Sequence, residues 1–440
     1  MNKCFFTKGS LSMTRKNISK GVNLNIIKSD KFKTNYMSVC FVLPIEKENI
    51  HLTSLLPKVL ARGCKKYPDM AKISERLEYL YASGINPVFI KRAQTVVVGF
   101  SADFIRDSFV PGDKGLLEDV SDLLFGLIFD ALAEDGAFKS EYVESEKIDL
   151  INIINAKINN KAAYAKDKCT EAMFEGHPYG LSEYGKAEDV KNITPEALYK
   201  RYEEIINGAP LEIFFNGECD EDALCGIIKK YVPETDRNTE FPGREFLIGK
   251  PERVTELEEE MPVAQGTLVM VLRIGGININ TEDSAAFSVF NELFGGSPSS
   301  KLFMNVREAM SLCYYCRSMP DQYMSTMFIS SGIETENKEK AKTAILEQLD
   351  AVKNGDFTEE DIEDAKRSMK NSYKELDDSQ SALCAWFLSR LLMGSTGNPD
   401  EVVEKILNVT KDEIVKAANK VELDTVYFIK GTGNEEGDEE

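Results

Sequence analysis

Histidine is scarce in this chain of 440 residues, which contains only His51 and His177. A catalytic metal centre built on imidazole groups needs at least two histidines placed together. These two stand far apart in the sequence and neither has a neighbouring histidine. The scarcity argues against a zinc site made from the chain's own histidines.

Basic character and long hydrophobic runs are missing as well. The net charge is −20, so we expect no nucleic-acid partner, because phosphate binding requires basic patches. No run approaches the ~18 apolar residues of a membrane-spanning helix, so no membrane span is expected. The N-terminal stretch, residues 1–17, lacks the uninterrupted apolar core of a signal peptide.

The nine cysteines form an odd set without a regular pattern. Without an export signal, this predicts a reduced protein located in the cytoplasm. Cys313 and Cys316 make a lone Cys-x-x-Cys motif, whereas a structural zinc site would need two such pairs or added histidines. If the segment is a strand, residues three apart point to opposite faces, so neither a metal nor a redox role is expected.

Hydrophobic periodicity predicts the same order of elements in both halves of the chain. In the first half we expect strands at 35–43, 94–102 and 211–217, with helices at 52–62, 70–82, 116–134, 139–166 and 194–207. In the second half we expect strands at 266–274, 325–333 and 425–431, with helices at 282–294, 336–354 and 358–375 and one that begins at Thr410.

Matching details indicate an internal duplication. Tyr81 follows Gly63 by 18 residues (81 − 63), and Tyr314 follows Gly296 by the same spacing (314 − 296). The pattern predicts an α+β protein of two duplicated domains, each with helices packed on a mixed sheet. We place the domains at 1–232 and 263–440, with a polar, proline-containing linker at 233–262.

The stretch 294–315 holds the most suggestive side chains. Gly295 and Gly296 open a Ser/Pro turn, and an amphipathic helix follows. Arg307 and Tyr314 are seven residues apart (314 − 307), so both would project from one side if the helix runs that far. Both can donate hydrogen bonds to the carbonyl oxygens of an extended peptide. The alternative is a surface arginine and a half-buried tyrosine.

Several short motifs occur here in a characteristic order. The second half contains Gly295-Gly296-Ser297, Ser300-Lys301-Leu302-Phe303, Val306-Arg307-Glu308 and Leu312-Cys313-Tyr314. The first half contains His177-Pro178-Tyr179-Gly180, then Gly185 and Asn192-Ile193-Thr194. With these motifs, nearly the whole chain resembles the insulinase/pitrilysin family of metallopeptidases, in its branch of two-domain chains like the mitochondrial processing peptidase.

The resemblance implies the LuxS/MPP-like metallopeptidase fold, with a mixed, mostly antiparallel sheet in each domain. Three further segments are similar to the bacterial branch associated with elongation factor P modification: Phe32-Lys33-Thr34, Tyr67-Pro68 and Leu80-Tyr81.

Active members of this family carry a His-x-x-Glu-His zinc motif on the first helix and a further glutamate ligand on a later helix. Counted back from Gly63, the motif falls on Ser54, Pro57 and Lys58. Counted from Glu146, the glutamate position falls on Ile153 (146 + 7). None of these side chains offers the family's zinc ligands or its base. The resemblance therefore implies no metal and no cofactor in this chain.

Chains of this family pair into a hollow clamshell, in which the zinc domain of one faces the second domain of the other. The resemblance implies a non-catalytic subunit of a heterodimeric zinc peptidase, with the zinc held by a partner chain that retains the motif. This chain would bind peptide substrate through Arg307, Tyr314, Gly295 and Gly296.

Other possibilities stay open. The chain could form a homodimer, or it could be a structural scaffold without a proteolytic role. An active zinc peptidase with unusual ligands is disfavoured by the two separated histidines. On its own the chain is not expected to be an enzyme.

Overall fold

The computed structural model describes residues 12–112, 115–243 and 245–433. They form two compact units, each assembled from separate segments of the chain. The first unit takes its described residues from Met1–Asn155, Leu181–Gly243 and Leu376–Leu392. The second takes them from Ala156–Gly180, Arg244–Glu375 and Met393–Glu440. Part of the N-terminal stretch considered above, residues 1–11, lies outside the described ranges.

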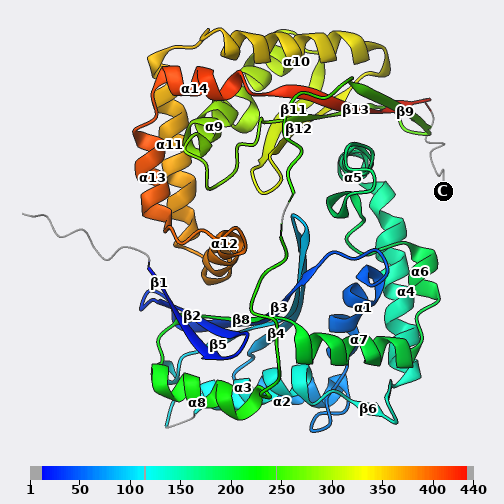
Figure 1. Cartoon of the computed structure of the whole chain (residues 1–440), viewed down its shortest axis with the longest axis vertical. Helices are drawn as coiled ribbons and strands as arrows, with labels where there is room; N and C mark the ends of the chain where they lie inside the picture. The colour runs from blue at the N-terminus through cyan, green and yellow to red at the C-terminus, as the bar shows by residue number, and fades with distance from the viewer. Residues whose placement is uncertain (1–11, 113–114, 244, 434–440) are drawn as a thin grey trace, which may run out of the picture. The chain divides into compact units, whose positions relative to one another are not determined.

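A six-stranded sheet forms the first unit, with the order β1-β2-β8-β3-β5-β4 (Figure 1). Strands β2 and β8 run parallel, and all other neighbours are antiparallel. The strands are β1 (Met13–Ser19), β2 (Val22–Lys28), β3 (Thr34–Pro44), β4 (Gly84–Arg92), β5 (Thr95–Ile105) and β8 (Leu211–Gly217). A small hairpin, β6 (Ala133–Glu134) and β7 (Ala137–Phe138), adds to the unit.

Both faces of this sheet are buried because apolar residues occupy consecutive positions along its central strand. On β3, Met37 and Val39 enter one core cluster, whereas Cys40 and Val42 enter another, as the alternation of a strand requires. Helices therefore cover both faces. They are α1 (Ile50–Leu60), α2 (Met70–Tyr79), α3 (Leu116–Phe129), α4 (Ser140–Ala156), α6 (Ala187–Lys191), α7 (Pro195–Gly208), α8 (Glu221–Tyr231) and α12 (Gln380–Leu392).

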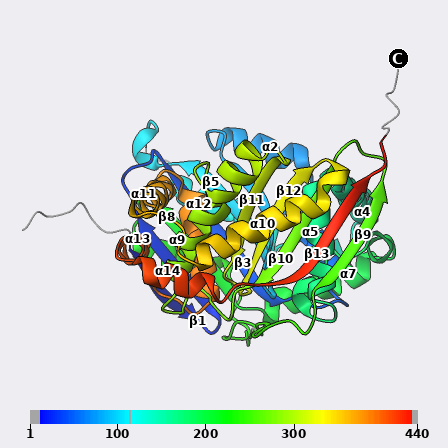
Figure 2. The ribbon, with the colours of Figure 1, turned by 90° about the horizontal axis from the view of Figure 1, so that it is seen from above.

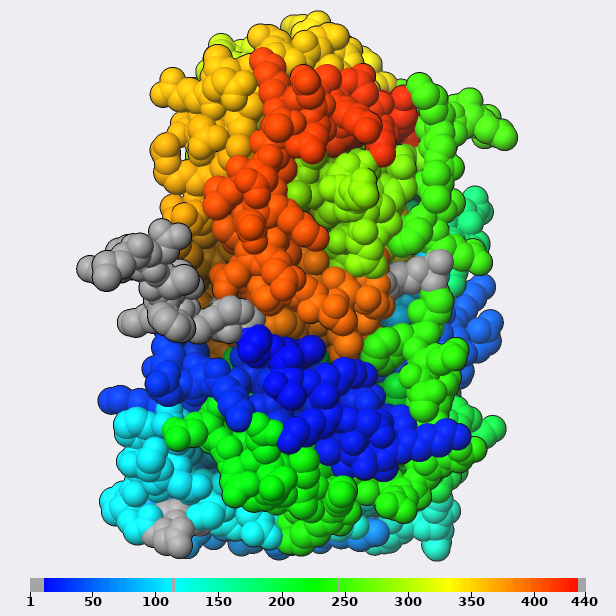
Figure 3. Space-filling view, turned by 60° about the vertical axis from the view of Figure 1, so that its left-hand side comes forward, coloured from blue at the N-terminus to red at the C-terminus, as the bar shows by residue number. Residues whose placement is uncertain are grey.

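The second unit has a five-stranded sheet with the order β11-β12-β10-β13-β9. Its strands are β9 (Thr255–Met261), β10 (Gly266–Arg273), β11 (Cys313–Asp321), β12 (Thr326–Ile333) and β13 (Glu422–Gly431). Its helices are α5 (Lys161–Met173), α9 (Ser284–Asn291), α10 (Lys338–Lys353), α11 (Glu359–Leu376), α13 (Pro399–Leu407) and α14 (Lys411–Ala418), together with π-helical turns at Glu292–Gly296 and Leu302–Ala309. Figure 2 shows α10 lying across the sheet. In Figure 3, α13 and α14 form one surface beside α9.

The two sheets repeat one topology. The order β2-β8-β3-β5-β4 of the first unit corresponds to β9-β13-β10-β12-β11 of the second. In each sheet only the first pair is parallel: β2 with β8, and β9 with β13. This repetition is what the predicted duplication requires, and the predicted fold class is confirmed.

Each half of the sequence contributes one helix to the unit formed mainly by the other half. α5 comes from the first half of the chain, but it packs Ala165 and Cys169 against β10 and β13 of the second unit. α12 comes from the second half, but it packs Leu383 and Phe387 against the sheet of the first unit. The boundaries 1–232 and 263–440 stay a prediction, because compact units do not identify duplicated blocks of sequence.

Several elements differ from those expected. The helix expected at 139–166 is broken at 157–159, because Asn160 caps a new helix by accepting the backbone N–H of Ala163. Part of the expected linker, Thr255–Met261, is strand β9. Its acidic run is tolerated in a sheet because three lysines pair with it: Lys342 with Glu256, Lys338 with Glu258 and Lys430 with Glu260. No helix in the described ranges is long and apolar enough to cross a membrane.

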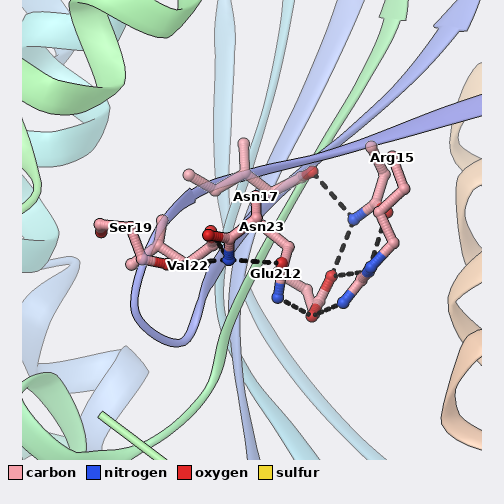
Figure 4. A network of polar contacts seen from close by, with 8 residues as sticks. Arg15, Asn17, Ser19, Val22, Asn23 and Glu212 are labelled. Atoms are coloured by element: carbon pink, nitrogen blue, oxygen red, sulfur yellow. Dashed lines mark hydrogen bonds and ion pairs between the residues drawn. The ribbon is translucent and has the colours of Figure 1, made fainter. Parts of the chain in front are cut away.

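A buried carboxylate ties β1 and β2 to β8 (Figure 4). Glu212 is fully buried and accepts two hydrogen bonds from Arg15, at 2.5 and 2.8 Å. Asn23 and Asn25 donate to the same carboxylate at 3.0 and 2.8 Å. An ionised carboxylate without such partners would lose its hydration at a large cost. The network therefore fixes the register of the edge hairpin.

We predict that Arg15→Met weakens the first unit by about 2–4 kcal/mol, because Glu212 keeps its burial but loses its cation. Hydrogen exchange of the amides of β2 and β8 measures the change. Lys20→Met is the matched control. It removes a cation whose partner, Asp236, is exposed, and should change stability by less than about 1 kcal/mol. Equal exchange rates in the two variants would contradict the role assigned to Arg15.

Candidate functional site

The positions that correspond to the zinc motif lie on α1 in the first unit. Ser54 is 1% exposed, and its hydroxyl lies 3.0 Å from the carbonyl oxygen of His51 and 3.3 Å from that of Tyr184. The hydroxyl is thus engaged within the fold. A neutral serine hydroxyl is also a poor substitute for the imidazole that zinc prefers.

Pro57 occupies the position of the catalytic glutamate. It is buried inside α1 and lines a small apolar cavity with Phe41, Leu60 and Tyr202. A carboxylate at this place would be desolvated without a polar partner, so the surroundings suit a carbon side chain and not a base.

Two cations, Arg62 and Lys58, act on the carboxylate of Glu146 on α4. Arg62 Nε lies 3.2 Å from the carboxylate of Glu146, and the charge of Lys58 also acts on that carboxylate. Burial raises the pKa of Glu146, and the two cations oppose this rise. The expected ligand position on α4, Ile153, is apolar and 39% exposed. These side chains do not fit a zinc ion.

The two histidines do not supply replacement ligands. Burial lowers the pKa of His51, which favours its neutral ring. His177 Nδ1 accepts the backbone N–H of Tyr179 at 3.1 Å, the role expected of a turn residue. Within residues 12–112, 115–243 and 245–433 there is no group of three or more His, Cys, Asp or Glu side chains arranged to hold a metal.

The second unit brings Arg307 and Tyr314 together, although not as the sequence predicted. The helical turn that carries Arg307 ends at Ala309, and Tyr314 lies on β11, so the expectation of one continuous helix face is wrong. Ser311, with φ of 51°, lets the chain reverse between them. Both side chains line an open pocket of about 360 Å³, together with Glu308, Ser311, Leu312, Cys313 and Glu334.

The pocket offers two hydrogen-bond donors. The guanidinium of Arg307 lies over the Phe303 ring, 4.5 Å from its centroid, which orients it. Its Nε is 3.7 Å from the carboxylate of Glu308, and the side chain is 39% exposed. Tyr314 is 52% exposed, and its hydroxyl donates to Glu334.

Glu334 is a pocket residue that the sequence reasoning missed. Its hydrogen bond with Tyr314 raises the pKa of the phenol, because the neutral form is the donor. Glu334 directly follows β12, the strand paired with β11. Knowing that pairing and its register would have placed Glu334 beside Tyr314, but the sequence pattern predicts neither the pairing of β11 with β12 nor its register.

Gly295 and Gly296 are packing residues in this structure. They end the turn Glu292–Gly296, and neither has a positive φ. A Cβ on Gly295 would lie 2.6 Å from Leu302 Cδ1 and 2.8 Å from the Ser318 backbone N. One on Gly296 would lie 2.8 Å from Asn291 Nδ2. Gly295 lets β11 approach the helical turns, whereas Gly296 makes room for Asn291 and Glu292. Neither glycine is among the residues that line the pocket.

We predict that Glu334→Gln lowers the pKa of Tyr314 toward its ordinary value of about 10, because the anionic acceptor is replaced by a neutral amide. NMR titration of ¹³Cζ-labelled tyrosine measures the pKa, and Tyr314→Phe assigns the signal. Glu336→Gln should have a smaller effect, because Glu336 acts only through its charge. A Tyr314 titration that is the same in Glu334→Gln and in the unchanged chain would refute this assignment.

Comparison with known proteins identifies the family. A model of the peptidase M16 inactive domain matches residues 192–369. The chain is 34% identical over 412 residues to a probable inactive metalloprotease, YmfF, of Bacillus subtilis, an alignment that covers 94% of this chain and 96% of the relative.

Solved structures agree in fold. A conserved protein from Enterococcus faecalis superposes with a TM-score of 0.89 at 27% identity, covering 96% of this chain and 99% of that chain. A peptidase M16 inactive domain from Pseudomonas fluorescens gives 0.77 at 17% identity, with the same coverage, and shows the fold alone. The similarity to the Bacillus subtilis relative over nearly the full length of both chains, on the duplicated fold described above, establishes that this chain belongs to the peptidase M16 family, also known as the insulinase/pitrilysin metallopeptidases.

Proposed function

We propose that this chain is the non-catalytic subunit of a heterodimeric zinc metallopeptidase and that it binds the peptide substrate. One observation carries the proposal. The family's zinc positions hold Ser54, Pro57, Lys58 and Ile153, whereas Arg307 and Tyr314 share an open pocket. The chain has side chains that can bind a peptide backbone, and its zinc-motif positions lack the side chains that hydrolyse one.

Both pocket side chains suit a peptide backbone. A guanidinium and a phenol each donate to carbonyl oxygens, and such donors also stabilise the negative charge that develops on a carbonyl under attack. Gly295 would act indirectly, by letting β11 pack closely against the turn that carries Arg307, and Gly296 by leaving room for Asn291 and Glu292. Tyr314 would exchange its bond with Glu334 for one with the substrate.

The partner would be a related chain that retains the His-x-x-Glu-His motif, and zinc would belong to that chain. A homodimer is the weaker version of the proposal, because both copies would lack the zinc ligands. We place the complex in the cytoplasm. The eight cysteines within the described residues are free thiols, which is compatible with a reducing compartment.

We predict that the purified chain alone cleaves no fluorogenic peptide, and that adding a motif-bearing M16 chain from the same genome gives cleavage. In that complex, Tyr314→Phe should lower kcat by about 100-fold, the effect of removing one donor to a developing oxyanion. Arg307→Ala should raise KM and lower kcat, because it removes both a binding contact and a charge.

Matched controls separate the pocket from general surface effects. Arg317→Ala removes an exposed arginine on the same strand, and Tyr79→Phe removes an exposed phenol in the first unit. Both should retain full turnover. Unchanged turnover in Arg307→Ala and Tyr314→Phe would overturn the proposed role of the pocket.

A scaffold role is the second candidate, and the Glu334 contact favours it. A phenol that is already bonded to a carboxylate of its own chain needs no external ligand. Under this alternative, the complex would form with the partner, but the partner's turnover would not depend on Arg307 or Tyr314.

A further inference from the structure

Strand β11 contains a bulge that places Cys313 and Cys316 on one face. Cys313 pairs with Ile333 of β12, Cys316 pairs with Ser331, and the register shifts between Cys313 and Tyr315. Ile333 and Ser331 are two apart on β12 and therefore share a face. Their partners share it too, so the expectation that the two cysteines point to opposite faces is wrong. Tyr314 is the extra residue of the bulge.

Glycine opposite the bulge makes this arrangement possible. A Cβ on Gly332 would lie 2.5 Å from Tyr315 Cε1, so the Tyr315 ring occupies the space that a side chain would fill. The Ser331 hydroxyl donates to the backbone carbonyl of Tyr315 at 3.0 Å. The ring of Tyr315 packed on Gly332 and the hydrogen bond from Ser331 thus both stabilise the bulge.

The two cysteines belong to one buried cluster of the second unit, but their surroundings differ. Cys313 lines the pocket with Arg307 and is 9% exposed, whereas Cys316 is 4% exposed and is not among the lining residues. An external molecule in the pocket would therefore meet Cys313 first.

The pKa values of the two thiols are shifted in opposite directions. The neighbouring Cys316 thiol lowers the pKa of Cys313 to about 7, and the charge of Arg307 acts in the same direction. The Cys313 thiol in turn raises the pKa of Cys316. By contrast, burial raises the pKa of Cys219 to about 11. A thiol whose pKa lies near the ambient pH is well suited to attack a disulfide.

We propose that Cys313 and Cys316 form a redox-active dithiol that exchanges with a low-molecular-weight disulfide entering the pocket lined by Arg307. The bulge places both cysteines on one face of the sheet, and of the two only Cys313 lines the pocket that an external disulfide would enter. The dithiol lies in the second unit of this chain and needs neither a partner subunit nor a substrate peptide.

The exchange balances as two successive displacements. The Cys313 thiolate attacks one sulfur of the external disulfide, forms a mixed disulfide and releases one thiolate. Cys316 then loses its proton to solvent, and its sulfur attacks Cys313 and releases the second thiolate. The protein gives up two electrons and one proton from each thiol, and the external disulfide becomes two thiols.

Oxidation of the two cysteines would also affect the proposed binding of the peptide substrate by Tyr314. A bond between Cys313 and Cys316 closes a small ring that contains Tyr314 and Tyr315. The backbone that aims the Tyr314 hydroxyl would then be held in one conformation, so the redox state of the pair would set the position of that phenol in the pocket.

The test begins with the unmodified full-length chain. Iodoacetamide labelling followed by peptide mass spectrometry gives the alkylation rate of each cysteine at several pH values. Cys313 should react at least about 10-fold faster than Cys219 at pH 7, with a midpoint near its pKa of about 7, because the thiolate is the nucleophile. A rate for Cys313 equal to or below that of Cys219 would overturn the proposal.

Glutathione disulfide then probes the second step. The unmodified chain should lose the mass of two hydrogen atoms and yield a Cys313–Cys316 cross-linked peptide. Cys316→Ser should instead retain glutathione on Cys313, and Cys219→Ser should behave like the unmodified chain. A glutathione adduct that persists on Cys313 of the unmodified chain would exclude Cys316 as the resolving thiol. Because no partner is present, these results are independent of the proposed peptidase role.

Discussion

The packing of α1 is the constraint that excludes the family's zinc ligands from the first unit. Ser54 is buried with its hydroxyl near two backbone carbonyls, and Pro57 is buried against an apolar cavity. An imidazole at the first position would have to displace the segment around Tyr184, and a carboxylate at the second would lose its hydration without a partner. The helix is therefore a core element that packs on the first sheet, and Ser54, Pro57 and Lys58 do not offer the family's zinc ligands or its base.

Much of the fold follows from local sequence signals. Thr194 caps α7, and Thr410 forms a capping box with Glu413 at the start of α14, as the sequence indicates. The apolar strands β3, β5, β10 and β12 were predicted as well, because a continuous apolar run between turn residues is typical of a strand buried on both faces. These features depend on neighbours in the sequence.

The rest could not be predicted because it depends on residues that are distant in the sequence. The acidic sequence of β9 is typical of a linker, and the residues that stabilise it as a strand, Lys338, Lys342 and Lys430, are distant in the sequence. The amphipathic patterns of α5 and α12 predict helices, but they do not say which sheet each helix covers. The pocket shows the same limit: the spacing of Arg307 and Tyr314 predicted one shared helix face, whereas the two side chains line the pocket from different elements. A turn and a strand join them, and the bulge that aims Tyr314 is visible only in the register of β11 against β12.

The most direct test of the account is the zinc content of the full-length chain after equilibration with zinc and gel filtration, measured by inductively coupled plasma mass spectrometry. A chain whose α1 carries no metal ligands should retain far less than one zinc ion per molecule. Retention of one zinc ion per molecule that is lost on Ser54→Ala or Lys58→Ala would contradict the account, because it would place a metal site on the helix described here as part of the core.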